Sequence, residues 1–359
     1  MKPPRQAHKS HFRTKIIRKI DGISPDQWRD VFPDVPENYF FLKTLDESKF
    51  DQFEFYYILV YEHKQLVGCA PCFVMNYAIK KNLPPIFSLK ALVCGIPMGQ
   101  GQMGIKNFSS PILGTIEECM EKLARKIHIP LLAFKDFDHS YDQLFKPLLK
   151  NGYLKIDSLP MTRQELDVDN FEEFLNKLSS ATRYDYRRKL KKNTNVKIEF
   201  STSTSLDEKT LDEAYELYLQ AVEIHDMGLE IVPKDFFRLI SKNMPQEARF
   251  FFWKVNGKLA AFCFCLVKKH LLLDYYLGFD YTLAHEYHLY FVKFKDMLEW
   301  CLAHKIKVYE FGATGYEPKR RLKFEFVPVY RYVKARPKIL RPVIKFLSLV
   351  RMRVGRNYS

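Results

Sequence analysis

Runs of aromatic, β-branched and other apolar residues, each interrupted by a short polar turn, occur at two distant places in the chain. FFFWKVNGKLAAFCFCLV (Phe250–Val267) and YYILVYEHKQLVGCAPCFV (Tyr56–Val74) both have this pattern. Aromatic and β-branched side chains suit a pleated, half-buried surface. Asn256–Lys258 is a strong two-residue turn signal, because Asn and Gly tolerate positive φ, and His63–Gln65 is a weaker one in the same place. Each stretch therefore predicts a β-hairpin.

The elements that follow each hairpin come in the same order. Apolar residues at a spacing of 3.6 predict a helix around His288–His304, between the expected strands His270–Phe279 and Ile306–Thr314. A further strand, Phe324–Val333, ends this half. The first half gives a fainter copy: a helix at Thr115–Ile127, a strand at Ile129–Phe137, a helical piece at 140–152 and a strand at 153–159.

The repeated order predicts an α/β protein built from two copies of one domain, each with a mixed central sheet flanked by helices. We expect an N-terminal domain at 1–160, a C-terminal domain at 161–335, and a basic amphipathic helix at 336–359. An alternative is that hairpins followed by helices are simply common in α/β proteins.

Composition and charge limit the partners. The 359 residues are 47% hydrophobic and carry a formal net charge of +15, which favours an anionic partner: nucleic acid, a membrane surface or a phosphate-bearing cofactor. No run reaches ~18 apolar residues, the N-terminus does not read as a secretory signal, and the seven cysteines read as reduced thiols. We therefore expect a cytoplasmic protein. The helix at 336–359 suits peripheral contact with an anionic membrane or nucleic acid, or docking on the protein's own surface.

Three segments of the second half resemble a known superfamily. They are an Arg-rich helical pair (Phe171–Lys192), a strand, loop and helix start (Asp274–Tyr290), and a strand ending in Gly with Tyr and Lys shortly after it (Tyr309–Pro328). Their order is similar to that of the acyl-CoA N-acyltransferase (GNAT) fold, and more specifically to its BioF2-like and tandem-domain Fem-type members. The resemblance implies tandem GNAT-like domains with the second copy catalytic.

The resemblance also implies which carrier and acceptor meet in the site. Such proteins move an acyl group from a carrier to an amine, with an acyl-CoA such as acetyl-CoA as co-substrate and no tightly bound cofactor. Many GNAT enzymes hold the CoA pyrophosphate on a Gly-rich turn, and the segment DYTLAHEYHLY has none. Aminoacyl-tRNA therefore stays open as the donor, with an envelope precursor as the acceptor.

In the fold that this chain resembles, the reacting groups meet where two central parallel strands separate. In this chain these are the ends of the strands that contain Asp274 and Glu310. Asp274 and Tyr276, two residues apart on one strand, are expected to share a face, and Asp274 is either a general base or a buried carboxylate satisfied by a partner. Glu310 has the same ambiguity. Tyr316 and Lys319 lie just after the second strand, where they are placed to donate to a leaving group or hold the carrier, or are ordinary loop residues.

A basic helix supplies candidate carrier-binding residues. Arg183, Arg187 and Lys191 recur at intervals of four and so share one face of a helix, which fits a phosphate of CoA or of a tRNA backbone. The alternative is a solvated helix face. No spacing of cysteine or histidine indicates a metal site. The sequence therefore predicts an N-acyltransferase, with a Fem-type aminoacyltransferase and a non-catalytic basic binding module as the alternatives.

Overall fold

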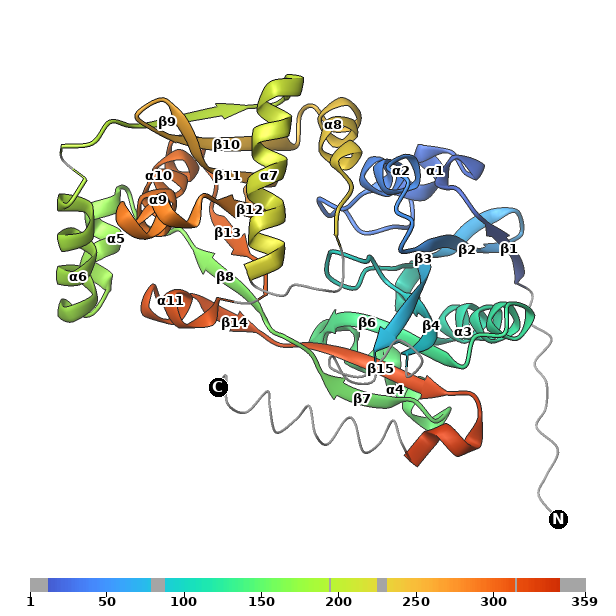
Figure 1. The fold of residues 1–359 in the computed structure, drawn as a ribbon. Coiled ribbons are helices and arrows are strands. Elements are labelled where there is room, and N and C mark those ends of the chain that lie inside the picture. The colour runs from blue at the N-terminus through green and yellow to red at the C-terminus, as the bar shows by residue number, and fades with distance from the viewer. Residues whose placement is uncertain (1–11, 79–87, 194, 225–230, 314, 343–359) are drawn as a thin grey trace, which may run out of the picture. The chain divides into compact units, whose positions relative to one another are not determined.

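The computed structural model describes residues 12–78, 88–193, 195–224, 231–313 and 315–342. The chain divides into two compact units. The first comprises residues 1–46, 50–158 and 328–359, and the second comprises 47–49 and 159–327. Each unit is built around one mixed sheet (Figure 1).

The sheet of the first unit has the strand order β1-β2-β3-β4-β6-β15-β7, with β5 paired to β3. β4 and β6 are parallel, and the other neighbours are antiparallel. The strands are β1 (Arg13–Ile17), β2 (Glu54–Glu62), β3 (Gln65–Ala78), β4 (Ser88–Cys94), β5 (Gly104–Ile105), β6 (Leu131–Asp138), β7 (Leu154–Asp157) and β15 (Val329–Ala335).

Helices cover both faces of this sheet. On one face α3 packs on alternate residues of β2, including Ile58, and α4 packs through Phe145 on Phe134 of β6. On the other face α1 packs through Trp28, whose ring lies 5.9 Å from that of Tyr57. The helices are α1 (Pro25–Arg29), α2 (Tyr39–Glu47), α3 (Ser110–Lys126) and α4 (Asp142–Lys150), with 3-10 turns at Ile20–Gly22, Lys106–Phe108, His139–Tyr141 and Lys338–Leu340.

The sheet of the second unit has the order β9-β10-β11-β12-β13-β8-β14. Among its described strands, β12 and β13 are parallel and the other neighbours are antiparallel. Its strands are β8 (Met161–Glu165), β9 (Ile198–Ser203), β10 (Ala248–Val255), β11 (Lys258–Lys268), β12 (Leu271–Phe279), β13 (Val308–Phe311) and β14 (Glu325–Val327).

One face of this second sheet carries α7, which Figure 1 shows lying across β10 to β12. The approach is close at Gly278, where an added Cβ would lie 2.6 Å from the backbone of Leu217 in α7. The core on the other face includes residues of α5, α6 and α10. The helices are α5 (Phe171–Lys177), α6 (Ser180–Lys191), α7 (Glu208–Ile224), α8 (Lys234–Asn243), α9 (Tyr281–Glu286), α10 (Leu289–Ala303) and α11 (Tyr316–Arg321).

The two sheets have the same order, which confirms the predicted tandem of mixed α/β domains. In each sheet one strand is inserted out of sequence order: β15 lies between β6 and β7, and β8 lies between β13 and β14. The structure differs from the expected domain ranges at residues 328–335. The sequence predicts them in the second domain, and the structure places them in the first unit. The expected strand Phe324–Val333 is divided at Pro328, which has no N–H to continue a ladder.

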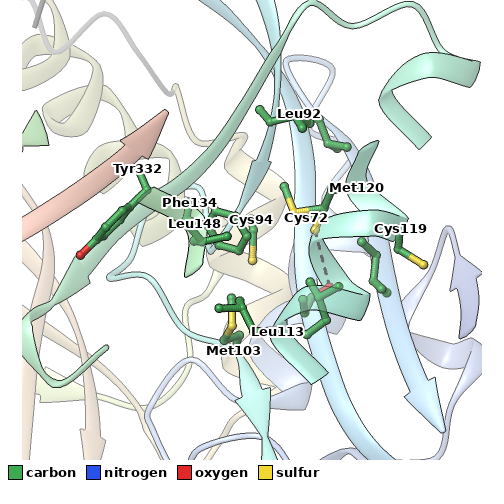
Figure 2. Close-up of a cluster of buried hydrophobic side chains, with 14 of the residues drawn as sticks. Cys72, Leu92, Cys94, Met103, Leu113, Cys119, Met120, Phe134, Leu148 and Tyr332 are labelled. Carbon is green, nitrogen blue, oxygen red and sulfur yellow. Dashed lines mark hydrogen bonds between the residues drawn. The ribbon is translucent and has the colours of Figure 1, made fainter. Parts of the chain in front are cut away.

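Figure 2 shows that β15 contributes a side chain to the buried core of the first unit. Tyr332 of β15 lies in the same buried cluster as Phe134 and Leu148. The predicted amphipathic helix at 336–359 lies mostly outside the described residues, which end at Pro342.

Candidate active site

The parallel strands β12 and β13 separate part of the way along β12. Their pairing runs from Leu271 opposite Val308 to Asp274 opposite Phe311. β12 then continues to Phe279, while β13 ends at Phe311. Among the described residues, no strand pairs with the far half of β12 on that side.

A β-bulge lies at the same point and changes which side chains share a face. Phe264 is opposite Tyr276 and Cys265 is opposite Asp274, so Tyr275 is the extra residue on β12. The expectation that Asp274 and Tyr276 share a face is therefore wrong. Asp274 lies on the α10 side, and the ring of Tyr276 lies 5.4 Å from that of Tyr218 in α7.

A buried cluster of polar groups surrounds Asp274. Its carboxylate accepts hydrogen bonds from Lys293 of α10, from the hydroxyl of Tyr309 at 2.7 Å and from the Cys263 thiol at 3.0 Å. Asp274 is 2% exposed and Lys293 is fully buried. Burial alone would lower the pKa of Lys293, but the neighbouring carboxylate of Asp274 outweighs it and raises that pKa. These contacts favour the alternative in which Asp274 is a satisfied buried carboxylate.

Lys319 is the second buried lysine on this side of the sheet. It comes from α11, is 3% exposed, and donates to the carbonyls of Phe311 at 2.6 Å and Gly312 at 3.0 Å. Thr162 of β8 donates to the same two carbonyls. Burial lowers the pKa of Lys319 to about 7, with Asp274 acting against that shift and Lys293 adding to it. Lys319 therefore changes charge near neutral pH, beside the end of β13.

Glu310 and Tyr316 lie near the same strand end. The rings of Tyr309 and Phe311 stack on the α10 side of β13, so Glu310 between them lies on the other face. Arg163 of β8 lies 3.9 Å from the Glu310 carboxylate. Its side chain is 19% exposed. Tyr316, the first residue of α11, is buried and donates to the Pro160 carbonyl at 3.0 Å. Tyr316 thereby fixes the start of the helix that carries Lys319.

The predicted basic face of α6 lies against α5. Arg187 is ion-paired with Glu172 at 2.6 Å, and Arg183 donates to the Asn176 carbonyl at 3.3 Å. Lys191 is exposed on the last turn. The sequence thus placed these cations on one helix correctly, but two of them have partners on α5.

Other polar groups near α10 were missed. Lys189 of α6 lies 3.8 Å from the centroid of the Phe291 ring, next to His288, which precedes α10 in a left-handed conformation. Burial and the nearby lysines lower the pKa of His288. Tyr290, in the first turn of α10, stacks on Phe311 and its buried hydroxyl has no hydrogen-bond partner among the described residues. An amphipathic helix pattern shows Tyr290 and Lys293 only as ordinary positions, so no local signal identifies them.

The first unit fills the corresponding separation with its own chain. β4 and β6 are paired as far as Cys94 opposite Phe134, and beyond that point Gly101 packs on β6, where an added Cβ would lie 2.2 Å from the Lys135 carbonyl. Lys135 donates to the carbonyls of Ile96 and Gly99 at 3.3 and 3.2 Å. In the first unit, therefore, the chain around Gly101 packs against β6 beyond the last residue pair of β4 and β6.

The polar cluster around Asp274 could also be considered as a metal site. Cys263, Cys265 and Asp274 offer ligand atoms within 4.8 Å of one another. The ammonium of Lys293 already binds the Asp274 carboxylate, and a cation placed there would face that charge. We therefore assign no metal to this cluster.

The two sheets of like strand order define a tandem protein of the acyl-CoA N-acyltransferase fold. The model of the FemAB-like family, described as peptidoglycan biosynthesis and recognition, matches residues 121–357. This is more than half of the chain, and the protein belongs to that family.

Solved structures are similar to this chain in fold at low identity. The chain is similar to FemX (TM-score 0.58, 12% identity, covering 92% of this chain and 99% of that one). It is also similar to a tandem GNAT protein from the clavulanic acid biosynthesis pathway (0.57, 13%, 90% and 98%). A third is the C-terminal domain of a putative lysylphosphatidylglycerol synthetase from Agrobacterium fabrum (0.51, 11%, 78% and 84%). These likenesses show the fold. No curated protein matches the chain.

Within the described residues, no helix is long and apolar enough to cross a membrane.

Proposed function

We propose that this protein transfers an aminoacyl group from aminoacyl-tRNA to an amine of a peptidoglycan precursor, at the open end between β12 and β13. The observation that carries the proposal is Lys319, a buried lysine whose pKa is lowered to about 7 and which lies at that strand end. Membership of the FemAB-like family supports the donor and acceptor classes. Of the two enzymatic alternatives in the sequence, the Fem-type one is now better supported.

Lys319 supplies the charge that the reaction needs. When an amine attacks an ester carbonyl, negative charge develops on the carbonyl oxygen and then on the leaving oxygen. In its ammonium form Lys319 stabilises the first and gives a proton to the second. A pKa near 7 makes that proton available at neutral pH, and burial strengthens the electrostatic effect.

Glu310 is the proposed base for the attacking amine. It lies on the face of β13 opposite Phe311, and therefore opposite Lys319, so that donor and acceptor approach the strand ends from different sides. In the transfer step the amine nitrogen forms the amide bond to the acyl carbon and loses a proton to the Glu310 carboxylate. The ester C–O bond breaks, and the leaving oxygen takes its proton from Lys319. Tyr276 shares that side through the bulge and is the proposed acceptor contact.

The basic helix α6 is the proposed binding surface for the carrier. Arg183, Arg187 and Lys191 suit a phosphate backbone, and exposed ion pairs such as that of Arg187 can be exchanged at little cost. Acyl-CoA is the second candidate donor, because the tandem GNAT neighbour is described in a form without acetyl-CoA. Membrane contact through 336–359 remains a prediction.

The test is binding and transfer with both donors. We expect saturable calorimetric binding of charged tRNA, weakened by Arg187→Ala, and transfer of a labelled amino acid to an amine-bearing peptidoglycan precursor. Lys319→Met should lower transfer by about 10²–10³-fold and Glu310→Gln by about 10²–10⁴-fold. Lys323→Met, an exposed lysine just after α11, is the matched control and should leave transfer unchanged.

Other results separate the alternatives. Saturable binding and turnover of an acyl-CoA alone would favour the acyl-CoA N-acyltransferase. Binding to any polyanion with a steep salt dependence, and no transfer from either donor, would favour the non-catalytic basic module.

A further inference from the structure

The buried pair of Asp274 and Lys293 has no counterpart at the matching position of the first unit. The last residue of β4 paired with β6 is Cys94, opposite Phe134, and the last residue of β12 paired with β13 is Asp274, opposite Phe311. Two copies of the same fold thus differ in a charged group at equivalent positions. Buried ion pairs are often no more stabilising than apolar side chains of similar volume. Folding of the sheet therefore does not explain this pair.

Geometry connects the pair to Lys319 through one aromatic ring. The Nζ of Lys293 lies 3.9 Å from the centroid of the Phe311 ring, and the Nζ of Lys319 lies 4.1 Å from it. Lys293 also donates hydrogen bonds to the Asp274 carboxylate and to the Tyr309 hydroxyl oxygen. Lys319 binds only backbone carbonyls and the ring, and none of the described residues places a carboxylate within ion-pair distance of it.

We propose that Lys293 and Asp274 are positioning residues that set the charge of Lys319 through space, with the ammonium of Lys293 favouring its neutral form and the carboxylate of Asp274 favouring its charged form. The inference rests on the proposed function of Lys319 and extends it to two residues that touch no substrate. The two charges oppose each other, so each can be removed separately with an effect of opposite sign.

The groups that face Lys319 are few. Among the described residues, Asp274 on β12 and Lys293 on α10 are the charged groups that act on it, in addition to burial. On its own helix, Glu317 is ion-paired with Arg321 at 2.5 Å. Tyr290 on α10 is uncharged at neutral pH, because burial raises its pKa. Replacement of Lys293 or Asp274 therefore changes the main charges that act on the titration of Lys319.

The experiment measures the titration of Lys319 directly. Full-length protein carrying lysine labelled with ¹³C at Cε is titrated by NMR, and Lys319→Met identifies the resonance. The variants are Lys293→Met, Asp274→Asn and the double variant, in which both charges are removed. Lys295→Met is the control, because Lys295 is on the same helix and pairs with Glu299 at 2.6 Å near the surface.

The expected order of the midpoints is Lys293→Met highest, the double variant between, and Asp274→Asn lowest, with steps of about one pH unit. The pH dependence of aminoacyl transfer should shift in the same order, and the control should shift neither. If Lys293→Met does not fold, the Lys319 midpoint of Asp274→Asn is compared with that of the double variant. These two differ only in the charge of Lys293, so the difference shows whether that charge lowers the midpoint.

The outcomes separate this inference from the proposed function. Equal Lys319 midpoints in all the variants, with transfer still dependent on Lys319, would overturn the inference and leave the function standing. The expected order of midpoints without transfer from any donor would support the charge coupling and overturn the function.

Discussion

Replacement of Tyr332 tests whether β15 completes the sheet of the first unit. Tyr332 follows the whole of the second unit in sequence, yet its side chain is 2% exposed within the core of the first unit. Its ring lies 4.9 Å from that of Phe145, and its hydroxyl donates to Asp142 at 2.8 Å. We expect Tyr332→Ala to destabilise the first unit and to leave the second unchanged.

The magnitude follows from the lost contacts. Truncation of a buried aromatic side chain to alanine costs about 3–5 kcal/mol, a large part of the ~5–15 kcal/mol that stabilises a typical domain. Tyr332→Phe keeps the ring and loses only the hydrogen bond to Asp142. That loss should cost about 1.5 kcal/mol, the low end for a charged acceptor, because Asp142 keeps its ion pair with Lys155.

Hydrogen exchange read segment by segment is the appropriate assay, because it reports opening of each unit separately. Amides of β6 and α4 should lose protection by the amount given above, and amides of β10 and β11 should not change. Tyr330→Ala is the control, since Tyr330 lies on the same strand but is only partly buried, and its effect should be smaller. Loss of protection in β10 and β11, or in neither unit, would refute the strand assignment.

Three further changes have expected outcomes. Burial raises the pKa of Asp46 to about 6 from 3.8, so its contribution to the stability of the first unit is greatest below pH 3.8 and is lost as pH rises through 6, by up to about 3 kcal/mol; urea unfolding should show this slope, and Asp46→Asn should flatten it. Gly278→Ala should cost about 1–3 kcal/mol, because the new Cβ meets the backbone of α7, whereas Gly114→Ala in α3, with open space around it, should stabilise by about 0.5–1 kcal/mol. Because the pKa of Lys319 is lowered, its stabilising contribution is complete only at high pH and is lost as pH falls through 7, so Lys319→Met should stabilise the second unit most below that pH in the same urea assay.

Local sequence patterns predicted the hairpins and the helix that follows the second one. The expected hairpins correspond to β2–β3 and β10–β11, and both turns have two residues with positive φ, including Asn256 and Gly257. The helix expected at His288–His304 is α10. These elements depend on neighbours close in sequence, which is what periodicity and turn chemistry record.

The parts that sequence reasoning missed depend on residues far apart in the chain. β15 pairs with β6, a strand that lies roughly 200 residues earlier in the chain, and the pattern of residues 324–333 gives no sign of that pairing. The bulge at Tyr275 reverses the face of Tyr276, and alternation cannot reveal an extra residue. The sequence predicts that Asp274 is either a general base or a buried carboxylate with a partner, but that partner, Lys293, lies on another element that no local pattern connects to it.

The late return of β15 also affects how the protein is made. Synthesis of residues 159–335 takes roughly 10–35 s at 5–20 residues per second. During that interval β6 and β7 of the first unit have no strand between them, and their ladder groups are open to pairing with other chains. The second unit, whose strands β8 to β14 are contiguous in sequence, can be completed first. The N-terminal half is therefore the last to reach its native state, and it is the half whose nascent form most needs protection from aggregation.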